Sequence, residues 1–326
     1  MPSAPNNMRH VLTFELLHRL RRLSTYVYAA LLFALSSLLV AAVGGAFKGV
    51  AISLGGGEKV VVNSPITVAN VIGLVSFLGL PVVAAIMGRA VQQDFEYEAY
   101  PFFFTSPISK LDYLGGRFLA ALLLLILIFS AIPAGAFFSS LGPWLDASRV
   151  GPSRAVAYLG PCLTILLPNL LLTGAVFFIM AALLRKILPV FLTAVIVLVG
   201  YLLGLSLTGE LENKTIAALV DPLGTLALNR LTEYWTIAER NARLIPLQGI
   251  FLANRALWLS IAVVVFALAY RRFAFAHALE KGKRGGRAEA ETAEGSGERI
   301  QVLAADKSFS RPLLCCRLSC GYRLLL

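Results

Sequence analysis

Hydrophobic side chains are gathered in long runs separated by short polar segments. Each run lacks a charged side chain near its centre and has about the 20 residues that a helix needs to cross about 30 Å of hydrocarbon. Lipid offers the backbone no hydrogen-bond partners, so runs of this length predict helices. The runs are 25–47, 67–88, 118–141, 155–184, 187–207 and 256–270. We therefore expect an all-α, polytopic membrane helix bundle with six transmembrane helices.

A different pattern precedes the first run. From Met8 to Leu23, apolar residues recur at helical spacing, with Arg19 and Arg22 between them. This pattern predicts an amphipathic helix within residues 1–24, lying flat on the inner leaflet of the membrane. A helical extension of the first span fits the same residues.

The polar segments suggest how the rest of the chain is organised. We expect a membrane domain at 25–276, with an inner loop at 89–117 and a large outer segment at 208–255. Residues 277–326 are expected to form a charged, disordered tail, because their first part cannot bury a core. The end of this tail fits neither a linker nor a further span. It suggests a shifted reading frame or a truncated reading of a longer gene.

Composition and charge assign an orientation. The chain is 58% apolar and 14% charged, against about 25% charged residues in soluble domains. Its net charge is +11, and the predicted spans place 20 of the 29 lysines and arginines on one side and nine on the other. The positive-inside rule then puts both termini in the cytoplasm of a multi-pass protein of the inner (plasma) membrane. The sequence shows no basic surface interleaved with aromatic residues, so nucleic-acid binding is not expected.

Several kinds of chemistry are missing from the sequence. No ionisable residue lies in the centre of a predicted span, which disfavours a proton-driven transporter, although neutral groups can still bind sodium. The histidines are His10, His18 and His277, at or beyond the span ends, so no haem or intramembrane zinc site is expected. The sequence contains no P-loop, G-x-S-x-G or H-E-x-x-H motif, and no other catalytic constellation is recognisable in it. We expect no enzyme activity, no cofactor and no metal.

The inner loop carries the most distinctive local pattern. Asp94 and Glu98 share one face of a short helix, with Glu96 on its flank. Aromatic residues beside them supply apolar surface. Pro107 breaks the helix, and either Ser106 or Ser109 can cap the next one. Two interpretations follow. The loop rests its aromatic rings among lipid headgroups, or it docks on a cytoplasmic partner through aromatic residues ringed by carboxylates.

A family resemblance bears on this choice. The Asp-x-Glu stretch, followed by T-S-P-I-S-K-x-x-Y-L-G-G-R-F at 105–118 and then by a span, resembles the permease subunits of type-2 ABC exporters. The amphipathic N-terminus, the six-span layout and the large outer segment are similar too. The strings DPLGTLALNRLTEYWTIAERN (221–241) and LANRALW (252–258) resemble a narrower branch, in which two six-span halves precede a zinc aminopeptidase-like domain. This chain matches only the first half, about residues 8–280, and peptidase activity is not implied.

The resemblance implies a function and partners. It makes 93–104 the helix that contacts a separate ABC ATPase, and 105–118 the entry into the third span. The residues implied in coupling are Asp94, Phe95, Glu96, Tyr97, Glu98, Tyr100, Pro107, Lys110 and Arg117. A second permease half, identical or related, and the lipid bilayer are the other partners. The alternatives are an ion-coupled secondary transporter and a non-transporting membrane scaffold. The substrate is not implied.

Overall fold

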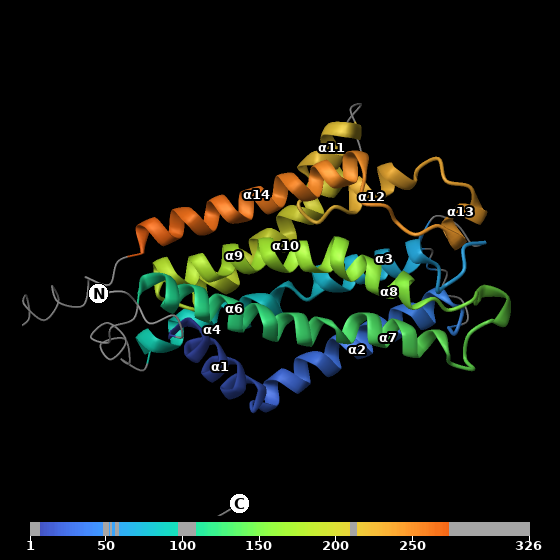
Figure 1. Cartoon of the computed structure of the whole chain (residues 1–326). Helices are drawn as coiled ribbons and strands as arrows, with labels where there is room; N and C mark the ends of the chain where they lie inside the picture. Colours follow the sequence, from blue (N-terminus) through green and yellow to red (C-terminus); the bar gives the residue numbers. More distant parts are fainter. Residues whose placement is uncertain are drawn as a thin grey trace, which may run out of the picture. The chain divides into compact units, whose positions relative to one another are not determined.

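Helices are the only regular elements in the part of the chain that the structure describes (Figure 1). The computed structural model describes residues 7–47, 52, 54–55, 59–96, 109–208 and 214–273, all of which belong to the unit Met1–Phe275. The prediction of an all-α fold is confirmed for these residues. The predicted tail, 277–326, lies outside them.

Long apolar helices form most of this unit. The α-helices are α1 (Asn7–Leu20), α2 (Leu23–Val43), α3 (Pro65–Leu78), α4 (Leu80–Glu96), α6 (Lys110–Phe129), α7 (Ala131–Ser140), α8 (Ala155–Pro161), α9 (Leu167–Leu184), α10 (Leu188–Thr208), α11 (Lys214–Val220), α12 (Thr225–Thr232), α13 (Ile237–Ala242) and α14 (Gly249–Arg272). A π-helical turn, Cys162–Leu166, joins α8 to α9.

Five stretches are long and apolar enough to cross a membrane. They are Leu23–Val43, Lys110–Ser140, Ala155–Leu184, Leu188–Ser206 and Gly249–Arg272. The pair α3 and α4 makes a sixth if the two helices count as one broken span. The described helices are therefore compatible with a membrane bundle of five or six spans, and the count of six stays a prediction.

The predicted run 67–88 is divided between α3 and α4, whose axes differ by 52°. Pro81, in the first turn of α4, has no N–H to continue the hydrogen bonds of α3. At Gly79, between the two helices, a Cβ would lie only 2.8 Å from the ring of the fully buried Phe129. The bend thus depends on a proline and on a close contact with a distant helix.

The core of the unit is built around α9. This helix packs on α4, α6, α10 and α14, and Figure 1 shows α14 running alongside it. The stretch Ala155–Leu184, which contains α9, has 67% of its most apolar part buried inside the unit. The corresponding value for Leu188–Ser206 in α10 is 11%. The apolar faces that α10 leaves uncovered suit lipid or another protein surface rather than the core of this unit.

The predicted outer segment 208–255 contains three short helices and the start of α14. Figure 1 shows α11, α12 and α13 gathered at the end of the unit where α14 begins. Buried side chains of this cap, including Ala218, Leu228 and Phe251, pack against Ala69 and Ile165 of the long helices. The cap is therefore held on the bundle by an apolar contact of its own.

The N-terminal helix α1 packs along α6. Two charged residues of this helix, Glu15 and Arg19, are buried in that contact, at 8% and 6% exposure. Contact of the opposite face of α1 with a membrane surface stays a prediction.

Candidate functional site

The predicted coupling residues lie partly inside and partly outside the described chain. Asp94 and Glu96 end α4, and Lys110 and Arg117 lie on α6. Phe95 belongs to α4, and nothing is described of its side chain. The remaining four, Tyr97, Glu98, Tyr100 and Pro107, lie outside the described residues. The structure therefore describes the two helices from which the loop emerges.

Asp94 is turned into the protein rather than toward a partner. Its side chain is 6% exposed. The Tyr113 hydroxyl donates to Asp94 Oδ2 at 2.6 Å, and Arg117 Nη2 lies 2.8 Å from both carboxylate oxygens. Arg117 Nη1 also donates to the carbonyl of Ala90, at 2.6 Å. Asp94 thus joins α4 to α6, whereas Glu96, two residues later, is exposed and accepts a hydrogen bond from Gln92.

The N-terminal helix contributes the other half of this arrangement. Glu15 on α1 lies 3.2 Å from Arg117 Nη2 and 3.1 Å from Arg19 Nε. Arg19 Nη1 reaches the carbonyl of Ile86 on α4 at 3.2 Å. Burial lowers the pKa of Arg19, an effect that the neighbouring Glu15 opposes. We name Glu15, Arg19, Asp94, Tyr113 and Arg117 the ion cluster. Its two carboxylates and two guanidinium groups balance in charge, and it ties α1, α4 and α6 together.

The start of α6 is anchored as well. Ser109 is its N-cap, since the side-chain oxygen accepts from the backbone N–H of Asp112 at 3.1 Å. This confirms one of the two caps predicted for the helix. The Lys110 ammonium lies 4.6 Å from the ring centre of Tyr270, near the end of α14. The loop therefore leaves α4 and rejoins α6 at two points that the tertiary structure holds in place.

The docking role of the loop itself is not tested by these contacts and stays a prediction. Asp94, which was expected on the docking surface, is buried and paired with Arg117, which lies in the predicted entry into the third span. They support the base of the loop. Glu15, Arg19 and Tyr113, which complete the ion cluster, were not among the predicted coupling residues. The sequence offers one signal for Glu15, since it is a lone glutamate within a basic amphipathic helix.

A second polar cluster lies at the end of the unit that carries the cap, which is predicted to face outward. Asn254 Nδ2 donates to the carbonyls of Ala218 and Asp221, each at 2.7 Å. Asn254 Oδ1 in turn accepts from Arg255 Nη2 at 2.7 Å, and Arg255 Nη1 donates to Asn169 Oδ1 on α9 at 2.9 Å. All three polar side chains are at least 96% buried. We name Asn169, Asn254 and Arg255 the outer cluster, which joins α9, α14 and the cap.

The turn between α11 and α12 fits closely over this cluster. The Asp221 carboxylate accepts from the backbone N–H groups of Leu223 and Leu226, at 2.9 and 2.7 Å. Gly224 has φ +76°, and a Cβ there would overlap the guanidinium of Arg255. Glycine is thus needed both for the backbone conformation and for space. The two strings that resemble the narrower ABC branch, 221–241 and 252–258, therefore meet at this cluster.

Comparisons with protein families and with curated proteins identify no relative. The chain matches no protein-family model, and no curated protein is detectably similar to it. The family resemblance thus depends on the residues quoted above.

Proposed function

We propose that this chain is a membrane-spanning permease subunit of an ABC exporter, forming half of the translocation path and energised by a separate ATPase. The observation that supports this most is the ion cluster. A loop that receives force from an ATPase needs a stiff connection to the spans on both sides, and the cluster supplies one between α4 and α6. Glu15 extends that connection to α1.

The proposal includes six spans, with α3 and α4 as one broken span, and both termini in the cytoplasm. The ion cluster then lies at the cytoplasmic end of the bundle and the outer cluster at the opposite end. A second permease half, either another copy or a related chain, completes the path. The ion-coupled transporter and the membrane scaffold remain the alternatives. Transport that persists without ATP would favour the former.

We predict that reporter fusions will show this orientation. A fusion at Glu239, in the cap, should give a signal from outside the membrane, and a fusion at Gly286 should give a cytoplasmic one. The physical reason is the excess of basic residues on one side of the spans. A cytoplasmic signal at Glu239 would be incompatible with the proposed topology.

The coupling role makes a second prediction. Truncating Phe95 or Tyr97 to alanine should weaken ATPase binding by about 2 kcal/mol, since buried aromatic anchors dominate such interfaces. Glu98→Gln should cost under about 1 kcal/mol, as expected for a charge at a rim. The measurement is recovery of an ABC-type ATPase with the affinity-tagged chain from mildly solubilised membranes, at equal amounts of inserted protein.

The matched control is Phe14→Ala, which removes an aromatic ring that is 68% exposed on α1 and is not a member of the ion cluster. It should leave ATPase recovery unchanged. If all the loop variants also recover the wild-type amount, the loop does not couple this chain to an ATPase. Recovery of other proteins without any ATPase would instead favour the scaffold.

A further inference from the structure

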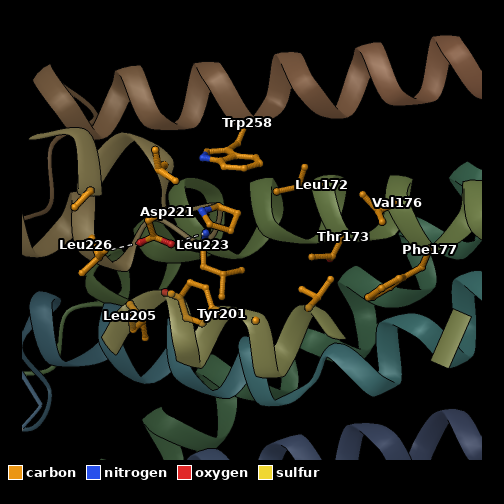
Figure 2. Close-up of a pocket in the computed structure, with 16 residues that line it drawn as sticks. Leu172, Thr173, Val176, Phe177, Tyr201, Leu205, Asp221, Leu223, Leu226 and Trp258 are labelled. Carbon is orange, nitrogen blue, oxygen red and sulfur yellow. Dashed lines mark hydrogen bonds between the residues drawn. The ribbon is translucent and has the colours of Figure 1, made fainter. Parts of the chain in front are cut away.

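An apolar cavity of about 380 Å³ lies between α9, α10, α14 and the turn that follows α11. Figure 2 shows Leu172, Val176 and Phe177 on one side of it, with Trp258 reaching in from α14 and Tyr201 from α10. The volume falls in the range of about 300–1,000 Å³ that is usual for small-molecule sites. The cavity could therefore hold a ligand of that size.

The polar side chains on the wall are already bonded to the protein. Thr173 donates to the carbonyl of Asn169 at 2.6 Å, and the indole N–H of Trp258 donates to that of Leu219 at 3.1 Å. The hydroxyls of Tyr201 and Thr225 are 2.5 Å apart, and Asp221 accepts from backbone N–H groups. A ligand would thus be held by contact with apolar surface, which favours a hydrocarbon over a polar solute.

Two glycines on α10 keep the cavity open. Gly200 and Gly204 lie one helical turn apart on its wall, and a Cβ added at either would meet no atom within 4 Å. Glycine inside a helix is less stable than alanine by roughly 0.5–1 kcal/mol, so packing among the described residues does not explain the pair. The missing side chains leave room on this wall for an apolar ligand.

We propose that this cavity binds one hydrocarbon chain of a lipid. Its walls come from three stretches that are apolar enough to span a membrane, so a ligand that partitions into the bilayer has direct access to the surrounding helices. The weakly buried α10 forms one of these walls. An acyl chain can come from a phospholipid or from a free fatty acid, and both have the chemistry that the cavity fits. The proposal goes beyond the permease role and requires no ATPase.

The chain contains a natural reporter for this site. Of its three tryptophans, Trp258 lines the cavity, whereas Trp144 and Trp235 lie in outer segments. We would replace those two with phenylalanine and reconstitute the protein in nanodiscs. Bromine on an acyl chain quenches a nearby indole, so quenching of Trp258 measures occupancy. One series adds phosphatidylcholine with brominated chains, and a second adds a brominated free fatty acid to an unbrominated bilayer.

We expect saturable quenching of Trp258 in at least one series, and the series that quenches identifies the source of the chain. Gly200→Leu with Gly204→Leu should raise the half-maximal mole fraction of brominated chains about tenfold, the effect of leaving about two methylene groups unburied. Gly160→Leu is the matched control. It is another helical glycine whose Cβ would meet no atom within 4 Å, but it does not line this cavity. It should leave the quenching curve unchanged.

Quenching that is equal in the wild type and the filled variants would overturn the proposal, since Trp258 would then sense only the surrounding bilayer. Absence of quenching in both series would also overturn it and would point to a second copy of the chain covering α10. Thermal unfolding checks that each variant folds. If the double leucine variant does not, Val220→Phe fills the cavity from α11 at a position that is 58% exposed, where little packing is disturbed.

Discussion

Replacing Arg117 with alanine is expected to lower the free energy of unfolding by about 3–5 kcal/mol, the usual cost of removing one partner of a buried ion pair. Arg117 is 3% exposed and contacts the carboxylates of both Asp94 and Glu15. Without it, the two carboxylates would lie close together and buried with the single guanidinium of Arg19. The measurement is the free energy of unfolding from SDS titration in mixed micelles, monitored by tryptophan fluorescence.

Two further variants separate the ion cluster from general effects of charge. Arg21→Ala removes an exposed arginine from the same end of the unit and should change stability by less than about 0.5 kcal/mol. Replacing all four charged members of the ion cluster by apolar residues of similar size should recover most of the loss, because no unpaired charge then remains. If Arg117→Ala is as mild as Arg21→Ala, the described pairing is wrong.

Asn254→Asp is expected to destabilise the protein by about 2–4 kcal/mol, although the two side chains have the same shape. Asn254 Nδ2 donates to the buried carbonyls of Ala218 and Asp221. An aspartate oxygen would leave these carbonyls without their donor, and each unsatisfied buried group costs about 1–3 kcal/mol. The gain from pairing the new carboxylate with Arg255 offsets only part of that cost. Unfolding is followed by the same SDS titration, and hydrogen exchange of 214–232 shows whether the cap loosens first.

Asn229→Asp is the matched control for this change. Asn229 is exposed on α12, so the same chemical substitution should alter stability by less than about 0.5 kcal/mol. A loss at Asn254 that equals the loss at Asn229 would contradict the outer cluster. Loosening of the cap without loss of overall stability would show that the cap and the long helices unfold separately.

The two clusters differ in what they offer to a transporter. The ion cluster braces the helices on both sides of the proposed coupling loop, so a push on the loop would move α1, α4 and α6 together. The outer cluster braces the cap against α9 and α14. Because the cavity beneath the cap shares α9 and α14 with it, a movement of these helices would change the cavity as well. This link would give the proposed lipid site and the proposed permease role a common structural basis.

Local sequence patterns determined the helical class and the approximate position of the long helices. Apolar runs of about 20 residues specify helices wherever backbone groups must bond within their own segment. The cap of α6 at Ser109 and the tight turn after α9 were also predictable, because both depend on neighbouring residues. Arg185, in that turn, takes φ +55°. Each of these features is a property of a few consecutive residues.

Only the tertiary structure decided which charges are buried and where α14 begins. The partners of Arg117 lie 23 and 102 positions away along the chain, at Asp94 and Glu15, and no local period relates them. The run 256–270 likewise missed the start of α14 at Gly249, because Arg255 reads as a charge at a membrane boundary until Asn169 and Asn254 surround it. The charge of a residue predicts that burying it carries a free-energy cost. Whether interactions offset that cost depends on groups that folding brings together.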